Sequence, residues 1–214
     1  MITLYTHNTP NGHKVSIALE ELGIAYEVKT IDVRAGAQHA PDFVALNPNA
    51  KIPVIIDSDT GLTVYESNAI LLYLADKAGK LMPKAGPEYW EAMELLVFQA
   101  ASIGPMYGQR AHFGFYAPDG SAYALSRYDK EGERLNAVMD RMLQARDWFL
   151  ASGFSIVDIA HYGWVHTAVR MGYAIGAYPH LNAWFERVSA RPAVQRGVAI
   201  PAALPPFRAP RRGE

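Results

Sequence analysis

A hydroxyl and a carboxamide flank a proline in Thr9-Pro10-Asn11-Gly12, between an apolar segment at Ile2–Tyr5 and helical periodicity that begins near Lys14. The start of a helix exposes unpaired backbone amides and a partial positive charge, which favour a thiolate over a thiol. Taken alone, these four residues are better explained as a favourable turn than as a functional site. Because the chain contains no cysteine, a thiol at this turn would have to come from a bound molecule.

Two other short segments place polar groups at the starts of expected elements. Lys51-Ile52-Pro53 opens an expected strand, and Glu66-Ser67 leads into an expected helix. Both have simple structural explanations when considered separately. Serine is a favoured helix cap and glutamate suits the positive end of a helix. Most X-Pro bonds are trans, and a lysine in a loop is commonly solvated.

Several common catalytic and metal-binding patterns are absent from the 214 residues. There is no HExxH motif, no phosphate-binding Gly-x-x-x-x-Gly-Lys loop and no Gly-x-Ser-x-Gly nucleophile elbow. The nearest pair of histidines on an expected helix, His161 and His166, is five residues apart, which is poor spacing for a shared metal. We therefore expect neither a metal site nor nucleotide chemistry.

Composition and charge are typical of a globular chain without a polyanionic partner. Half of the residues are apolar, 19% are charged and the formal net charge is -1. Basic residues gather only in Arg208–Arg212, which argues against binding to nucleic acid or an anionic membrane. No apolar run approaches the roughly 20 residues that span a bilayer, and Met1 leads into a strand pattern instead of a signal peptide. We expect a cytoplasmic protein, and the absence of cysteine fits that expectation.

Residues 1–78 alternate strands and helices in the order βαβ-ββα. The first two strands flank a helix that ends at Gly23, so a right-handed crossover should make them parallel. The last two strands flank a turn-rich connection and should form a hairpin. The strands are expected at Ile2–Tyr5, Tyr26–Val33, Ile52–Ile56 and Leu62–Tyr65, followed by a helix at Ser67–Ala78. This order predicts a mixed four-stranded sheet with helices packed on it.

The strand pattern disappears after a linker at residues 79–86, and residues 87–200 are expected to be all-helical. Helices are expected at Pro87–Ile103, Ala122–Leu150, Ile156–Met171 and Pro179–Ala190. Ser155-Ile156-Val157-Asp158 is a capping box with a structural role at the start of the third helix. Residues 201–214 form a tail rich in proline and arginine. The predicted fold class is therefore α/β plus all-α.

Thr9-Pro10-Asn11-Gly12, Lys51-Ile52-Pro53 and Glu66-Ser67 in a βαβ-ββα unit together resemble the N-terminal thioredoxin-like domain of glutathione transferases. The helical second half and its capping box are similar to the same family, so the resemblance covers about residues 1–200. Further segments look like the bacterial Nu class, which includes glutathione-dependent disulfide-bond reductases and is similar to fungal nitrogen-regulator proteins. These segments are Thr9-Pro10-Asn11-Gly12-His13-Lys14, Gln38, Gly104-Pro105-Met106-Tyr107-Gly108-Gln109 and Ala124-Leu125-Ser126-Arg127-Tyr128.

The resemblance implies that the first turn holds the sulfur of bound glutathione. The Thr9 hydroxyl and Asn11 would be the catalytic pair, donating hydrogen bonds to that sulfur. The Ile52-Pro53 bond would be cis, which frees the preceding backbone groups to pair with the cysteinyl part of glutathione like an added strand. Lys51 would then lie near the glycine carboxylate.

The rest of the glutathione site also follows from the resemblance. Glu66 would bind the γ-glutamyl ammonium, and Ser67 with the helix amides would bind the γ-glutamyl carboxylate. Gln38 matches a glutathione contact of the Nu class, although it would otherwise be a surface residue. Arg127 matches another, reaching a site from the neighbouring subunit, with a surface salt bridge as the alternative.

The second substrate is expected to meet the sulfur between the two domains, against a wall of aromatic and polar side chains. As a stripe on one helix these side chains could equally form a core. They are Met106, Tyr107, Gln109, His112, Phe113 and Phe115. The chain departs from the family pattern at residues 150–154 and in the C-terminal tail, which affects the acceptor pocket more than the glutathione site.

The resemblance implies a homodimeric glutathione transferase-like enzyme that uses glutathione as co-substrate. In the leading hypothesis, the glutathione thiolate attacks a small disulfide and a second glutathione resolves the product, which needs no protein cysteine. One alternative is conjugation to a carbon electrophile or reduction of a peroxide. Another is a glutathione-binding regulatory protein without turnover, because a fold does not dictate an activity.

Overall fold

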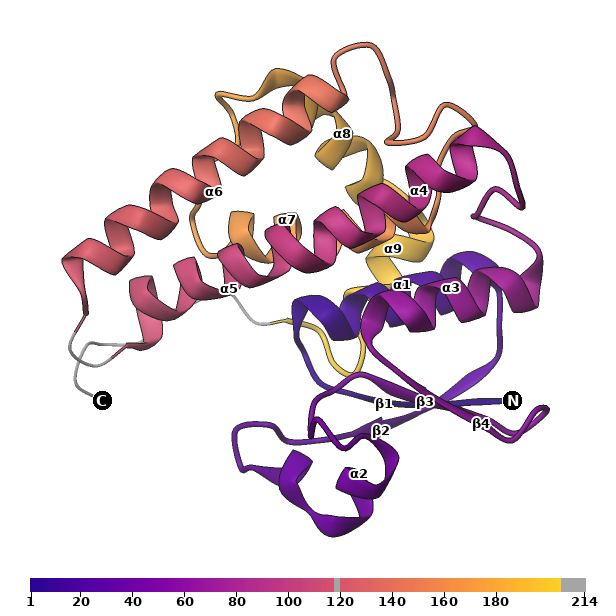
Figure 1. Ribbon diagram of the computed structural model, residues 1–214. Helices are drawn as coiled ribbons and strands as arrows, with labels where there is room; N and C mark the ends of the chain where they lie inside the picture. Colours follow the sequence, from indigo (N-terminus) through magenta and orange to yellow (C-terminus); the bar gives the residue numbers. More distant parts are fainter. Residues whose placement is uncertain (118–119, 205–214) are drawn as a thin grey trace. The chain divides into compact units, whose positions relative to one another are not determined.

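The computed structural model describes residues 1–117 and 120–204, which form two compact units (Figure 1). Unit 1 comprises Met1–Met82 together with Ser189–Leu204, and unit 2 comprises Pro83–Val188. The sequence-based division ends the first domain at residue 78 and keeps residues 189–200 with the helical domain, whereas the structure groups them with unit 1. Most of the expected tail, residues 205–214, lies outside the described residues.

Unit 1 is built on a four-stranded mixed sheet in the order β2-β1-β3-β4. Strand β1 (Ile2–Thr6) pairs in parallel with β2 (Tyr26–Thr30) and antiparallel with β3 (Val54–Asp57). Strand β3 forms a hairpin with β4 (Leu62–Tyr65). The predicted βαβ-ββα order and mixed sheet are confirmed.

The strand expected to reach Val33 stops earlier because the chain turns at Asp32. The Asp32 carboxylate accepts hydrogen bonds from the amides of Arg34 (3.0 Å) and Ala35 (3.2 Å). A side chain that bonds to amides further along the chain competes with the strand ladder and favours a turn. The strand pattern therefore ends at Thr30.

Two helices cover one face of the sheet. Helix α1 (Pro10–Leu22) and helix α3 (Ser67–Ala78) lie side by side over it, whereas α2 (Pro41–Leu46) lies on the opposite side (Figure 1). A single helical turn at Ala37–His39 precedes α2. The bounds of α3 are the predicted ones, but α1 begins four residues before the predicted start because Pro10 occupies its first turn.

The C-terminal helix α9 (Pro192–Gly197) packs against α1. Gly197 lies so close that an added Cβ would stand 2.6 Å from the Ile17 Cα. The Ser16 hydroxyl donates to the Gly197 carbonyl at 2.7 Å. Contacts of this kind come from residues about 180 positions apart, so no local pattern in the sequence predicts the helix.

Unit 2 contains helices whose first members form one helical run from residue 87 to residue 116. The wider π-type turns Gln99–Ile103 and His112–Tyr116 flank α5 within that run. The helices are α4 (Pro87–Phe98), α5 (Gly104–Ala111), α6 (Ala122–Met142), α7 (Ile156–Arg170) and α8 (Pro179–Ser189). The all-helical character predicted for this part of the chain is confirmed.

The helix predicted to run to Leu150 ends at Met142. In the segment that follows, the Phe149 amide donates to the Asp158 side chain instead of to a carbonyl of the same helix. Asp158 accepts hydrogen bonds from the Phe149 amide (3.1 Å), the Ser155 amide (2.9 Å) and the Trp184 indole (2.9 Å). The predicted capping box is present. Burial raises the pKa of Asp158, while these hydrogen bonds act in the opposite direction. The Asp158 carboxylate, on α7, thus holds both the segment that precedes α7 and helix α8.

The described part of the chain contains no helix that is both long enough and apolar enough to cross a membrane. Within residues 1–117 and 120–204, His, Asp and Glu side chains form no group of three or more that could hold a metal ion.

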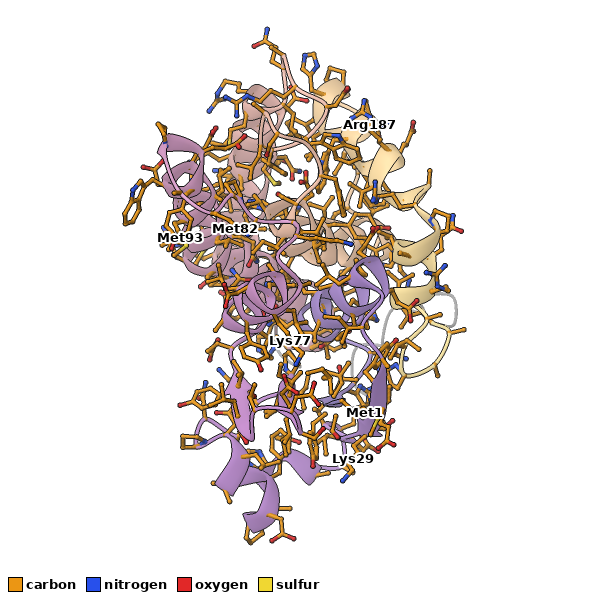
Figure 2. The ribbon with its side chains drawn as sticks, turned by 90° about the vertical axis from the view of Figure 1, so that its right-hand side faces the viewer. Met1, Lys29, Lys77, Met82, Met93 and Arg187 are labelled. Carbon is orange, nitrogen blue, oxygen red and sulfur yellow. The ribbon has the colours of Figure 1, made fainter. Side chains whose placement is uncertain are left out.

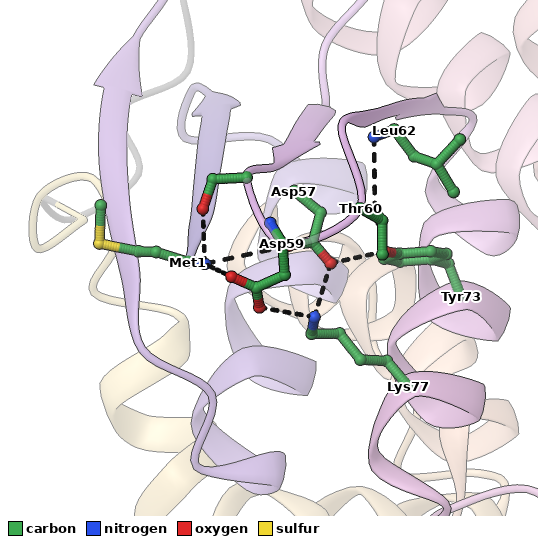
Figure 3. Close-up of polar contacts among 8 residues, drawn as sticks. Met1, Asp57, Asp59, Thr60, Leu62, Tyr73 and Lys77 are labelled. Atoms are coloured by element: carbon green, nitrogen blue, oxygen red, sulfur yellow. Dashed lines mark hydrogen bonds and ion pairs between the residues drawn. The ribbon is translucent and has the colours of Figure 1, made fainter.

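A polar cluster joins α3 to the end of β3 in unit 1. Lys77 extends from the last turn of α3 toward the sheet (Figures 2 and 3), where its ammonium lies 2.7 Å from the buried carboxylate of Asp57. The Tyr73 hydroxyl donates to the same carboxylate at 2.5 Å. Burial would raise the pKa of Asp57, but the hydrogen bonds from Lys77 and Tyr73 hold it below its ordinary value.

We expect Asp57→Asn to lower the free energy of unfolding by about 1.5–3 kcal/mol near neutral pH, because it removes a charged acceptor from two donors. A carboxyl whose folded pKa is depressed adds stability above its ordinary pKa, and that stability is lost as pH falls through the folded pKa. The difference between the variant and wild type should therefore shrink below about pH 4. Urea unfolding across this pH range measures it.

Asp59→Asn is the matched control, since Asp59 also pairs with Lys77 but its side chain is 58% exposed. It should cost much less than Asp57→Asn. Equal losses for the two variants would contradict the role given to the buried carboxylate.

Candidate functional site

The Thr9 side chain caps the first helix of unit 1. Its Oγ1 accepts a hydrogen bond from the Gly12 amide at 3.1 Å, and Pro10 fills the first helical position. A hydroxyl has two acceptor positions and one donor, so the cap leaves the hydroxyl hydrogen able to donate to a ligand. Donor and helix end together favour a negatively charged atom beside Thr9.

Gly12 is needed for this turn because the chain folds back closely on itself. A Cβ at this position would lie 2.4 Å from the His7 carbonyl oxygen and 2.5 Å from Thr6 Oγ1. The Thr9 amide donates to the same His7 carbonyl at 2.7 Å. The sequence interpretation of this turn rested on Thr9 and Asn11, and the structure adds the steric requirement at Gly12.

Strand register brings the three predicted segments to one edge of the sheet. Tyr5 on β1 pairs with Val54 on β3, and Val54 pairs with Tyr65 on β4. The chain leaves β1 toward the Thr9 turn, enters β3 from Pro53 and leaves β4 toward Glu66. All three polar segments therefore emerge side by side at this end of the strands, which we call the polar edge of the sheet, although Thr9 and Glu66 are 57 residues apart in the chain.

A buried asparagine shapes the loop that enters β3. The Asn47 side chain, 1% exposed, donates to the Lys51 carbonyl at 2.7 Å and accepts from the Asn49 amide at 2.9 Å. The Ile52-Pro53 bond is cis, as the resemblance implies, and the Lys51 side chain is exposed. Sequence reasoning missed Asn47, because a turn-forming asparagine is common and its burial depends on the fold.

Glu66 stands at the start of α3 in an unusual backbone conformation. Its φ is 68° and its ψ is 115°, a region that residues other than glycine rarely adopt. Backbone strain of this kind concentrates at binding and catalytic sites. The Glu66 side chain is exposed, whereas Ser67, the first residue of the helix, is buried.

Lys14 is a residue of this region that the sequence did not single out for a role. Its ammonium donates to Ser67 Oγ at 3.2 Å and to Asn68 Oδ1 at 3.0 Å, and its side chain is almost fully buried. Burial lowers the pKa of Lys14 to about 7, with the negative charge of Glu66 acting in the opposite direction. A lysine next to the apolar positions of α1 could have indicated a buried charge, but the direction of the Lys14 side chain could not be predicted from the sequence.

Gln38 follows β2, which runs parallel to β1 and so ends at the same edge of the sheet. The Gln38 Oε1 atom is buried without a hydrogen-bond partner within the described structure, and its amide nitrogen lies 3.2 Å from His39 Nε2. A buried carbonyl oxygen normally has a donor. Gln38 therefore offers an acceptor that a ligand could satisfy, and its glutathione contact stays a prediction.

The six predicted acceptor-pocket residues lie in unit 2, on α5 and the wider turn that follows it. Phe113 stacks on Tyr128 with ring centroids 5.5 Å apart, and Phe115 meets Tyr173 edge-on at 5.8 Å. His112 is exposed and packs edge-on against Phe113. Phe113 and Phe115 thus have different aromatic partners, and Met106 and Gln109 lie one to two turns earlier on α5.

Tyr107 differs from the other five residues because its hydroxyl already has a partner. Tyr107 is buried and donates a hydrogen bond to the Asn136 side chain on α6. Burial raises the pKa of Tyr107. We therefore expect Tyr107 to support the helix and not to donate to a substrate.

Arg127 lies on the exposed side of α6, and its positive charge helps to lower the pKa of Glu131. The hydrogen bond from Arg134 is the larger cause of that shift. These contacts are within unit 2, and the predicted glutathione contact of Arg127 is a separate question.

A cavity of about 450 Å³ lies elsewhere in unit 2, between α4 and the segment that follows α6. Its lining includes Glu91, Arg141 and Arg146, and Arg146 is already ion-paired with Glu91 at 2.5 Å. None of the predicted site residues lines it.

The comparisons with known proteins cover almost the whole chain. The family model of the glutathione S-transferase N-terminal domain matches residues 1–76, and that of the C-terminal domain matches residues 105–192. The chain belongs to the glutathione S-transferase family. Its N-terminal match contains the Thr9 turn, Pro53 and Glu66, so the polar edge of the sheet lies in the family's N-terminal domain.

Individual relatives of this transferase-family chain include the disulfide-bond oxidoreductase YfcG of Escherichia coli strain K12. The two are 39% identical over 198 residues, covering 90% of this chain and 92% of YfcG. A glutathione transferase from Pseudomonas putida, crystallised with one glutathione disulfide per subunit, is 38% identical with a TM-score of 0.89, covering 94% of this chain and 92% of its own.

A third relative is a glutathione transferase from Burkholderia graminis, crystallised with two glutathione molecules per subunit. It is 40% identical with a TM-score of 0.89, covering 94% of this chain and 88% of its own. The resemblance to the family is thus confirmed, and the narrower Nu class assignment stays a prediction.

We expect Gly12→Ala to lower the free energy of unfolding by about 1–3 kcal/mol, because the new Cβ would collide with the His7 carbonyl and Thr6. Urea unfolding of the ligand-free protein measures the loss. Gly176→Ala is the control, since an added Cβ there has no atom within 4 Å. An unchanged midpoint for Gly12→Ala would show that the turn relaxes without cost.

Proposed function

We propose that this chain is a glutathione-dependent enzyme in which the thiolate of bound glutathione, held at the Thr9 turn, reduces small disulfides. The observation that carries the proposal is the Thr9-capped start of α1, beside the cis Ile52-Pro53 bond, in a chain without cysteine. A nucleophilic sulfur must then come from the ligand. The name of YfcG and the glutathione ligands of the two structural relatives support the same reaction class.

Each part of glutathione has a proposed partner at the polar edge of the sheet. The Thr9 hydroxyl and Asn11 donate to the sulfur, and the backbone before Pro53 pairs with the cysteinyl group. Glu66 takes the γ-glutamyl ammonium and Ser67 the neighbouring carboxylate. The glycine carboxylate lies near Lys51, and Gln38 and Arg127 are further glutathione contacts. The start of α3 at Ser67, with the Lys14 ammonium donating to the Ser67 hydroxyl, supports this arrangement.

The reaction balances with glutathione as the only reductant. The bound thiolate attacks one sulfur of the substrate disulfide, forming a mixed disulfide and releasing the other sulfur as a thiolate. A second glutathione thiolate then attacks the glutathione sulfur of the mixed disulfide and releases the second substrate sulfur. Two electrons pass to the substrate, the two glutathione protons end on the product thiols, and glutathione disulfide is formed.

Thr9→Ala should lower kcat/KM for a model disulfide by about 10- to 100-fold, because a hydrogen bond to a charged group is lost. The pKa of bound glutathione should rise, which the pH dependence of the rate and the ultraviolet absorbance of the thiolate both measure. Thr9→Ser is the control, because it keeps both the hydroxyl donor and the helix cap. Thermal unfolding separates the loss of the cap from the loss of the donor.

Parallel assays with a chloronitroaromatic compound and a hydroperoxide distinguish disulfide reduction from conjugation and peroxidase activity. If glutathione binds and no substrate turns over, the protein is a binding module and the enzyme proposal is wrong. Wild-type rates for Thr9→Ala would remove Thr9 from the mechanism.

We also propose that the protein is a cytoplasmic homodimer. Trp90 and Val97 support the dimer, because they lie seven residues apart on one face of α4 and are 66% and 59% exposed. Large apolar side chains that face solvent together are typical of an interaction surface. A second copy of the chain is the partner that the family resemblance implies.

Trp90→Glu should shift the protein from dimer to monomer at micromolar concentration, because a charge replaces the largest exposed apolar group of α4. Light scattering over a dilution series measures the mass. Val28→Glu, on the edge strand β2, places the same charge at another exposed site and should leave the mass unchanged. A wild-type protein that is monomeric at every concentration would remove both the dimer and any cross-subunit role of Arg127.

A further inference from the structure

Lys14 is a charged side chain placed almost wholly inside unit 1. It is 2% exposed, and its ammonium donates to Ser67 and Asn68 at the first two positions of α3. Placing an ammonium there is costly, because burial removes its hydration and the Ser67 and Asn68 acceptors are uncharged. A hydrophobic residue would fill the same space without that cost. The position therefore calls for an explanation beyond packing.

Among the charged groups in the described residues, the negative charge of Glu66 acts on Lys14 and opposes the lowering of its pKa by burial. Glu20 and Glu21 lie about two turns further along α1, where they pair with Arg196 and Arg191 at 2.6 and 2.7 Å. Asp76 and Lys77 lie at the far end of α3, and Lys77 pairs with Asp57 at the opposite edge of the sheet. His13 adjoins Lys14 on α1 and is buried as well.

We propose that Lys14 is a positioning residue for the γ-glutamyl carboxylate of glutathione: its ammonium orients Ser67 and Asn68 and supplies positive charge behind the start of α3. This inference rests on the proposed function, since it concerns the same ligand. Lys14 acts through Ser67, one hydrogen bond away from the carboxylate. The ammonium of the ligand faces the exposed Glu66 instead.

Proton uptake on binding follows from this arrangement. Burial lowers the pKa of Lys14 to about 7, so the ligand-free protein holds a mixture of charged and neutral forms near neutral pH. A carboxylate docked at Ser67 favours the charged form, which raises the pKa of Lys14 in the complex. Binding at pH 7 should then take up about half a proton per site, and the uptake should fade well below pH 7, where Lys14 is already charged.

Titration calorimetry of wild type with S-methylglutathione, in buffers of different ionisation enthalpy, counts these protons. The blocked sulfur removes the thiol proton from the count. Lys14→Met should abolish the uptake and weaken binding about tenfold or more, by loss of a hydrogen-bonded charge. Circular dichroism and thermal unfolding establish that the variant is folded.

A ligand without the carboxylate tests the role of Lys14 directly. The 4-aminobutyryl analogue of S-methylglutathione lacks only that group, so wild type and Lys14→Met should bind it with equal affinity. A merely structural lysine would weaken both ligands by the same factor. Lys14→Arg should bind S-methylglutathione without proton uptake, because arginine stays charged.

The outcomes separate this inference from the proposed function. Wild type that binds S-methylglutathione without taking up protons, or Lys14→Met that binds it as tightly as wild type, overturns the role of Lys14 and leaves the glutathione site standing. Wild type that does not bind S-methylglutathione overturns both. If Lys14→Met fails to fold, the proton count of wild type decides alone.

Discussion

The pairing of β1, β3 and β4 in one register is the constraint on which the candidate site depends. Tyr5, Val54 and Tyr65 lie in a row across the sheet, so the segments that follow or precede them begin at the same edge. A slip of one residue in either pairing would turn every side chain to the other face and separate these segments. The burial of alternate residues in β1, Ile2, Leu4 and Thr6, opposes such a slip. The packing of the core of unit 1 and the geometry of its polar edge therefore depend on the same strand register.

That edge carries features that cost stability where they stand. Lys14 is a buried cation that donates to the uncharged Ser67 and Asn68, Glu66 has a φ of 68°, and Gln38 has a buried oxygen without a partner in the described structure. Each is unfavourable in a ligand-free protein, and features of this kind concentrate at binding sites. The opposite edge differs, because there the buried Asp57 carboxylate accepts a hydrogen bond from Tyr73 and pairs with Lys77. Strain and unsatisfied groups thus gather at the edge where the three segments meet.

Local patterns predicted the parts of this protein that depend on local chemistry. Both ends of Ser67–Ala78 and of Leu62–Tyr65 were predictable because helix starts, glycines and tight turns mark them. The end of α6 was predicted wrongly, because Asp158 holds the Phe149 amide from nine residues further on. Helix α9 and the direction of the Lys14 side chain were beyond prediction for the same reason, since both depend on packing between distant segments. The proposed glutathione-site residues came from resemblance, and strand register brings only the segments at Thr9, Pro53 and Glu66 to one edge.

A chain without cysteine limits how the protein can accelerate thiol chemistry. Without a thiol of its own, the protein cannot form a mixed disulfide with the substrate. Its proposed contribution is therefore confined to binding, orientation and stabilising the charge of the glutathione sulfur. Stabilising the thiolate increases its population but lowers its intrinsic nucleophilicity, and the best attacking thiol has a pKa near the ambient pH. In the proposed site, the Thr9 hydroxyl, the Asn11 carboxamide and the start of α1 would be the donors to the sulfur, a modest set that suits a small shift in its pKa. A fixed cation beside the sulfur would stabilise the thiolate further and make it a poorer nucleophile, and Lys14 is instead directed toward the start of α3.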